Sequence, residues 1–224
     1  MLKEILCLCS VLADDRISDD RCWCDEEWQL SQDDRFLILP QDDWFLTLMA
    51  LHEVSDDMDI EMAFYNPDDQ FHRQKAKELQ EGGVHLVAMV GVDDKRALPE
   101  HAQAMICCED ARLIIQLIAN ASIRSDYINI PCMDLYDLLR VLNGVFYHQR
   151  LTAMGDNQPQ SIANQFKGIV SKFHNMFCFI RGYEVSTCEL QQFEGHLSCD
   201  VFWVLGENEN LQNEMVVDLL YSLA

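Results

Sequence analysis

The fold is decided by residues 60–92, which read IEMAFYNPDDQFHRQKAKELQEGGVHLVAMVGV. The runs at 60–65 and 84–92 are almost entirely apolar, which predicts two buried strands. Between them, residues 66–69 (NPDD) predict a turn, and residues 70–80 predict an amphipathic helix that ends at a pair of glycines. A strand, a helix and a second buried strand in this order indicate a parallel α/β sheet.

Segments on either side continue this alternation. Upstream, residues 36–39 (FLIL) predict a short buried strand, and 43–54 predict a largely buried helix because apolar side chains fall on every turn. Downstream, 97–106 predict a helical stretch, and 109–123 predict a long helix facing the core. The apolar side chains that fall at helical spacing in the long helix are Leu113, Ile114, Leu117 and Ile118.

The last ninety residues differ in style from the first part. Strands are predicted at 146–154, 175–182, 199–206 and 215–223, and helices at 135–145, 159–173 and near 188–197. We therefore expect a partial parallel-sheet α/β half (33–122), joined by the long helix near 110–122 to a mixed-sheet α+β half (123–224). Residues 1–32 form a separate acidic, cysteine-containing segment in this division.

The composition excludes several classes of protein. The chain has 224 residues, with 38 acidic against 16 basic side chains and a formal net charge of -22. This excess of acid disfavours broad binding to nucleic acid or to an anionic membrane, because phosphates are repelled. Only nine glycines are present, which disfavours a phosphate-binding loop. A hydrophobic content of 49% excludes a disordered chain.

The acid is concentrated in the first half, where residues 1–112 hold 26 acidic and ten basic side chains. Seven Asp-Asp doublets, from Asp14-Asp15 to Asp93-Asp94, contribute to this excess. We favour solvated loops between strands and helices as their role. An acidic docking face for a basic partner, or a mimic of DNA, is the alternative.

Ten cysteines indicate a reducing compartment, so we expect a cytoplasmic protein. The apolar run at 5–12 is too short to span a membrane and lacks the flanks of a signal peptide. Zinc held by Cys7, Cys9, Cys22 and Cys24 is disfavoured because C-x-C is tighter than the usual spacing. Cys107-Cys108 with His101 upstream offers the groups of a cysteine hydrolase but no signature, and burial of these thiols in a helix is favoured.

From about residue 33 to the C-terminus the chain resembles the latter two-thirds of FtsZ, the bacterial tubulin homologue. The resemblance is clearest at 127–154 (YINIPCMDLYDLLRVLNGVFYHQRLTAM), where the family has a loop, a helix and a strand. Residues 161–173 resemble the next helix, and 175–193 a strand, turn and helix. Residues 199–224 are similar to the family's closing hairpin.

The departures from this family are informative. FtsZ and tubulin hold GTP on a glycine-rich loop of the GGGTGTG kind. The resemblance sets Leu39-Pro40-Gln41-Asp42-Asp43-Trp44 at this place, with no glycine and with two carboxylates where phosphates would lie. We therefore expect no bound GTP, no other cofactor and no catalysis.

A second family element is partly kept. The Asn-x-Asp-x-x-Asp loop, which reaches the nucleotide of a neighbouring subunit in the family, reads Asn129-Ile130-Pro131-Cys132-Met133-Asp134 here. Half of the acidic pair is gone, and we favour Asp134 as the N-cap of the helix that follows. The resemblance implies protein–protein contact through Asn129, Asp134, Tyr136 and Arg140.

The favoured function is therefore that of a degenerate, non-catalytic FtsZ/tubulin-like protein of bacterial cell division. Its partner would be FtsZ or another subunit of a complex, and a homo-oligomer is left open. No nucleic acid and no membrane is expected among its partners. The alternative is an acidic interaction protein or DNA mimic that inhibits a basic partner.

Overall fold

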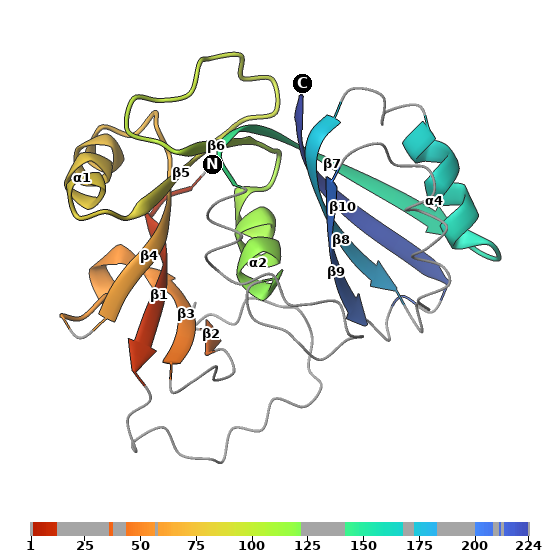
Figure 1. Cartoon of the computed structure of the whole chain (residues 1–224), viewed down its shortest axis with the longest axis horizontal. Helices are drawn as coiled ribbons and strands as arrows, with labels where there is room; N and C mark the ends of the chain where they lie inside the picture. Colours follow the sequence, from red (N-terminus) through yellow and green to blue (C-terminus); the bar gives the residue numbers. More distant parts are fainter. Residues whose placement is uncertain are drawn as a thin grey trace.

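The computed structural model describes residues 2–12, 36–37, 44–56, 58–121, 142–167, 173–182, 200–207, 211 and 213–223. In this part of the chain ten strands form one mixed sheet, and three α-helices pack against it (Figure 1). The predicted α/β class is confirmed.

The four central strands of the sheet are parallel, and the flanking strands pair antiparallel except for the edge strand β9. Its strands follow the order β2-β3-β1-β4-β5-β6-β7-β10-β8-β9. β4, β5, β6 and β7 pair in parallel, while β1 pairs antiparallel with both β3 and β4. β10 pairs antiparallel with β7 and β8, and β9 runs parallel to β8. The strands are β1 (Leu6–Leu12), β2 (Phe36–Leu37), β3 (Trp44–Ala50), β4 (Met58–Tyr65), β5 (His85–Val90), β6 (Ala104–Cys107), β7 (Gly144–Met154), β8 (Phe173–Gly182), β9 (Asp200–Glu207) and β10 (Glu214–Leu223).

The helices are α1 (Gln70–Glu81), α2 (Ala111–Ala121) and α4 (Gln158–Lys167). α1 begins and ends as its sequence predicts: Asp69 is its N-cap, and Gly82 is its C-cap. Gly83 follows with a φ of +87°, a conformation that glycine adopts without steric cost. α1 and α4 lie towards opposite ends of the molecule, with α2 between them (Figure 1).

Two apolar cores cover the two faces of the parallel strands. On β5, Val87 and Met89 belong to the core that contains α2, whereas Leu86, Ala88 and Val90 belong to the core that contains Ala76 of α1. β5 is therefore buried on both faces, as its continuous apolar run predicts. Full burial of each larger side chain stabilises the fold by about 1.5–3 kcal/mol.

α2 packs on strands from both ends of the sheet. Its core contains Leu8 of β1 and Met62 of β4, and also Phe177 of β8 and Leu220 of β10. Residues 122–141 lie outside the described part, so the prediction of a long helix that joins two halves stays untested. The division at 32 and 122 also stays a prediction, although Leu6–Leu12 form strand β1 inside the sheet.

The prediction of a buried helix at 43–54 is wrong. Trp44–Ala50 form strand β3, and a 3-10 turn at Leu51–Glu53 follows it. The sequence WFLTLMA is apolar at nearly every position, so periodicity cannot distinguish a buried strand from a buried helix. The segment forms a strand because all seven of its residues pair with residues of β1 in the sheet.

The helical prediction for 97–106 is also wrong. Ala104–Cys107 form strand β6, which lies between β5 and β7. Ala and Met favour helices in isolation, but all four residues of β6 are buried between two parallel partners. The predicted long helix therefore begins only at Ala111.

The predicted closing hairpin is wrong in its pairing. β9 and β10 both form, but β10 inserts between β7 and β8, and among the described strands β9 pairs only with β8. The other predicted strands of this half are confirmed as β7 and β8, and α4 confirms the helix predicted from 159 as far as Lys167. Most of the helix predicted at 135–145 and all of the one near 188–197 lie outside the described residues; Gly144 and Val145 belong to β7.

Candidate functional site

The candidate site lies at the carboxyl edge of the parallel strands. β4 leads through residues 66–69 into α1, β5 leads into the segment 91–103, and β6 leads through 108–110 into α2. Ligands of open α/β sheets bind outside this edge, where loops and helix N-termini meet. The chemistry of these three loops therefore decides what the edge can hold.

The loop before α1 is satisfied by its own hydrogen bonds. Asp69 Oδ1 accepts from the His72 N–H at 3.0 Å, and Asn66 Oδ1 accepts from the Asp68 N–H at 3.0 Å. The Asn66 N–H donates to Nδ1 of the buried His72 at 3.1 Å, and Arg73 Nη1 donates to the Pro67 carbonyl at 2.8 Å. The hydrogen bond from the His72 N–H is the main cause that lowers the pKa of Asp69, so a carboxylate occupies this helix N-terminus.

α2 begins in the same way. Asp110 Oδ1 accepts from the backbone N–H of Arg112 at 3.1 Å and of Leu113 at 3.2 Å. These are N–H groups that have no partner within the helix. Both described helices that start at the carboxyl edge are thus capped by an aspartate from the chain itself.

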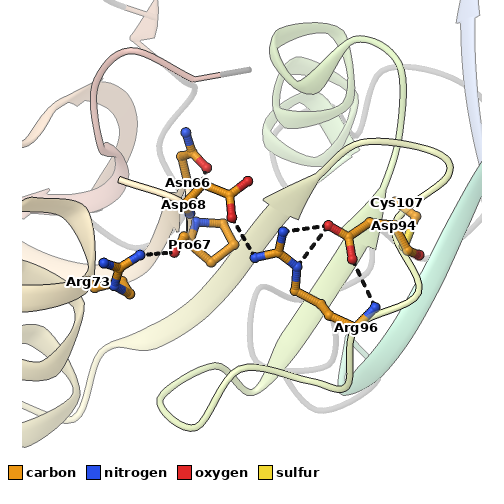
Figure 2. Close-up of polar contacts among 7 residues, drawn as sticks. All are labelled: Asn66, Pro67, Asp68, Arg73, Asp94, Arg96 and Cys107. Atoms are coloured by element: carbon orange, nitrogen blue, oxygen red, sulfur yellow. Dashed lines mark hydrogen bonds and ion pairs between the residues drawn. The ribbon is translucent and has the colours of Figure 1, made fainter. Parts of the chain in front are cut away.

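A single arginine joins the loops after β4 and β5. Arg96 Nη1 lies 2.7 Å from Asp68 Oδ1, and Arg96 Nε lies 2.7 Å from Asp94 Oδ2, as Figure 2 shows. The Arg96 backbone N–H also donates to Asp94 Oδ1 at 2.8 Å. The hydrogen bond from the Arg96 side chain is the main cause that lowers the pKa of Asp94. Two of the seven doublets therefore meet at one guanidinium.

An open cavity of about 480 Å³ lies along the side of α1. One wall comes from the helix and the other from the segment 96–101, and the end of β4 and the loop after it complete the lining. The residues that line the cavity are Tyr65, Pro67, Arg73, Gln74, Ala76, Lys77, Arg96, Ala97, Pro99, Glu100 and His101.

A second charged cluster lies on the sheet between β7, β10 and β8. The fully buried Asp218 accepts from His148 Nε2 at 2.8 Å, from Arg150 Nε at 2.8 Å and from Arg181 Nη2 at 2.5 Å. Burial alone would raise the pKa of Asp218, but hydrogen bonds from His148 and Arg150 and the charges of the two arginines lower it to about 2. Arg181 Nε is buried and finds no hydrogen-bond partner in the described part. This cluster links three strands, and Asp218 pairs in the β10–β8 ladder with Phe179, a residue of the core that contains α2.

The residues predicted to bind a partner, Asn129, Asp134, Tyr136 and Arg140, lie outside the described residues. So do residues 39–43 of the stretch that the resemblance set at the phosphate loop. The next residue, Trp44, opens a strand and not a helix. The strand–loop–helix arrangement that a phosphate loop requires is found instead at residues 66–69.

The predicted cysteine sites are only partly described. Cys7 and Cys9 are buried in β1, and burial raises the pKa of Cys9 to about 12. Their predicted zinc partners at 22 and 24 lie outside the described residues. Cys107 is buried in strand β6 and Cys108 directly after it, so burial is confirmed but in a strand. The His101 ring Nδ1 contacts Gln80 Oε1 at 2.8 Å.

Nothing within the described ranges brings three His, Cys, Asp or Glu side chains together in a way that could ligate a metal. Among the same residues, no helix combines the length and the apolar character that a membrane crossing requires.

Sequence reasoning missed Arg96, Asp110 and Asp218. The signal for Asp110 was present, because an aspartate directly precedes the predicted helical run. The signal for Asp218 was also present: one acid stands inside the apolar strand MVVDLLYSL. No local sequence pattern indicates the role of Arg96, because its partner Asp68 is 28 positions away in the chain.

The architecture matches solved structures of the FtsZ group. FtsZ from M. jannaschii, in a structure of an empty dimer, aligns with a TM-score of 0.50 over 65% of this chain and 57% of that chain, at 13% identity. The described chain has an FtsZ-like fold. A mutant form of the same FtsZ gives a TM-score of 0.49 at 11% identity, over 66% of this chain and 59% of that chain. CetZ from Methanosaeta thermophila gives 0.43 at 15% identity, over 72% and 59%.

The chain thus spans less than two thirds of the length of these FtsZ-like proteins. No protein-family model and no curated protein matches the sequence. The similarity to FtsZ is therefore one of fold, at low sequence identity.

Proposed function

We propose that this chain is a non-catalytic protein of FtsZ-like fold that acts through protein–protein contacts and regulates the assembly of an FtsZ-like filament. The observation that carries the proposal is the pair of aspartate caps at the carboxyl edge. Asp69 occupies the N-terminus of α1, and Asp110 occupies that of α2. A phosphate-binding protein keeps these N–H groups for its ligand.

The charges around the edge support the same conclusion. A triphosphate at this edge would meet the carboxylates of Asp69 and Asp110 and would have to displace their hydrogen bonds. Arg96, the guanidinium that joins the loops after β4 and β5, is already paired with Asp68 and Asp94. Repulsion between like charges at a few ångströms costs about 1 kcal/mol in water and several times more near a protein surface.

The partner-binding face is proposed from the sequence resemblance. Asn129, Asp134, Tyr136 and Arg140 belong to the stretch that resembles the inter-subunit loop and helix of FtsZ. FtsZ itself, or another subunit of the same assembly, is the expected partner, in the cytoplasm of a dividing cell. Contact through this face would cap or block a filament end without nucleotide bound to this chain.

Co-sedimentation with FtsZ polymers from the same source tests the proposal. We expect the full chain to pellet with the polymers or to reduce their mass at substoichiometric ratios. Arg140→Glu should abolish either effect, whereas the matched reversal Arg112→Glu, at an exposed position of α2, should leave it unchanged. No pelleting and no change in polymer mass for the unmodified chain would contradict the proposal.

The alternative of an acidic DNA mimic has less support. It requires the Asp doublets to present free charge on one face at phosphate-like spacing. Asp68 and Asp94 lie near each other, but Arg96 neutralises part of their charge. Binding to a basic DNA-binding protein, measured in competition with DNA, would revive this alternative.

A further inference from the structure

The cavity along α1 concentrates positive charge in a strongly acidic chain. Three of the 16 Lys and Arg residues, Arg73, Lys77 and Arg96, line its walls, against one carboxylate, Glu100. Because Arg96 is paired with Asp68 and Asp94, Arg73 and Lys77 are the cations left for a ligand. The volume of about 480 Å³ lies within the range of small-molecule sites.

The two cations are placed to act together. Arg73 and Lys77 are four positions apart, so they lie one above the other on the same side of α1. Arg73 uses Nη1 for the Pro67 carbonyl, which fixes the guanidinium and leaves its other N–H groups for a ligand (Figure 2). Lys77 forms no hydrogen bond or ion pair within the described residues, whereas Lys75 on the same helix pairs with Glu78 at 2.7 Å.

A hydroxyl without a partner in the described part of the chain, on a residue that lines the cavity, is the second, independent observation. Tyr65, the last residue of β4, is 2% exposed, and it shares both a core cluster and the cavity lining with Ala76 of α1. Its hydroxyl makes no hydrogen bond to the described part of the chain and keeps some contact with solvent, and Tyr65 is one of the residues that line the cavity. A hydroxyl of a largely buried residue that has no protein partner is usually satisfied by a ligand or by water.

We propose that this cavity binds a small phosphomonoester that also carries a hydroxyl group. Arg73 and Lys77 would hold the phosphate, to which the Tyr65 hydroxyl would donate, and Glu100 would accept from the hydroxyl of the ligand. Burial raises the pKa of Tyr65, so its proton is retained at neutral pH. Pro67 and Pro99 provide apolar walls for the carbon skeleton. The cavity shares Pro67 and Arg96 with the loops at the carboxyl edge, and its ligand does not depend on the proposed filament partner.

Isothermal titration calorimetry of the full chain with glycerol 3-phosphate, inorganic phosphate and glycerol tests this inference. We expect saturable binding of glycerol 3-phosphate, weaker binding of inorganic phosphate and none of glycerol. Lys77→Gln should weaken binding roughly tenfold or more, since a hydrogen bond to a charged group is lost. Lys75→Gln is the matched control and should bind as the unmodified chain does.

Tyr65→Phe separates a ligand contact from a structural role. Because the hydroxyl has no partner in the described part of the chain, its removal should leave the melting temperature unchanged while it weakens binding several-fold. Absence of saturable binding by the unmodified chain would overturn the inference. Equal affinities for the Lys77→Gln and Lys75→Gln variants, or full affinity after Tyr65→Phe, would overturn the assignment of these residues.

Discussion

Replacement of Asp218 with Asn is expected to lower the free energy of unfolding by about 2–3 kcal/mol. The Asp218 side chain is fully buried and accepts hydrogen bonds from His148 and Arg150 of β7 and from Arg181 of β8. An Asn amide has the same shape but no charge, and its NH2 group would face donors. Three strands would then lose the carboxylate that links them.

The magnitude follows from burial and from the pKa. Removal of one partner from a buried ion pair costs about 3–5 kcal/mol. Arg150 keeps 42% of its side chain exposed, so water would compensate part of this loss. A pKa lowered from 3.8 to about 2 corresponds to about 2 kcal/mol, at roughly 1.4 kcal/mol per unit. Burial and the pKa therefore both give a loss of about 2–3 kcal/mol in the free energy of unfolding.

The pH dependence has a defined sign. The folded-state pKa of Asp218 lies below its unfolded value, so the ionised group stabilises the fold above about pH 4. This contribution is lost as the pH falls towards 2. The difference in stability between the unmodified chain and Asp218→Asn should therefore shrink over this interval, while charge effects common to both proteins cancel.

Urea unfolding of both proteins between pH 7 and pH 2.5 is the assay. Glu214→Gln is the control, because it removes an acid from the same strand that is only partly buried; it should change stability by less than about 0.5 kcal/mol. A loss below about 1 kcal/mol for Asp218→Asn, or a difference that does not depend on pH, would refute this reasoning.

Three further outcomes are expected. Phe177→Ala should lower the free energy of unfolding in urea by about 3–5 kcal/mol, because Phe177 is 1% exposed in the core that contains α2. The control Phe71→Ala, at a side chain that is 60% exposed, should lower it by less than about 1 kcal/mol. Equal losses of stability for the two variants would contradict the placement of Phe177 in this core. Gly83→Val should lower the melting temperature and destabilise the fold by about 1–3 kcal/mol, because valine is strained at the Gly83 φ of +87°. The control Gly91→Val, at a position with open space around it, should leave the melting temperature unchanged. Burial raises the pKa of Cys9 to about 12, so this thiol should be alkylated at pH 8 only after the chain unfolds. Peptide mass spectrometry measures the extent of alkylation. Alkylation of Cys9 in the folded chain at the rate of a free thiol would exclude its burial.

The central parallel unit was predictable because its signals are local. In residues 60–92 the turn residues, the amphipathic helix and the two apolar runs each indicate the same structure. β3 and β6 were mistaken for helices because their sequences are apolar at nearly every position, which leaves no strand periodicity to detect. The insertion of β10 between β7 and β8 depends on pairing across more than thirty residues, which no local pattern encodes.

The candidate site was predictable only in its composition. The doublets Asp68-Asp69 and Asp93-Asp94 are visible in the sequence, and so is the absence of glycine from the loop at 66–69. That Asp69 caps α1 follows from its place before the helical run. That Arg96 joins Asp68 to Asp94 depends on the parallel pairing of β4 with β5, which brings the two loops to one edge.

The most direct test of the account is a nucleotide titration of the full chain. A fluorescent GTP analogue should show no saturable change in anisotropy at micromolar protein, because Asp69 and Asp110 occupy the helix N-termini at the carboxyl edge. Saturable binding in the micromolar range, displaced by unlabelled GTP, would contradict the claim that this FtsZ-like fold works without nucleotide.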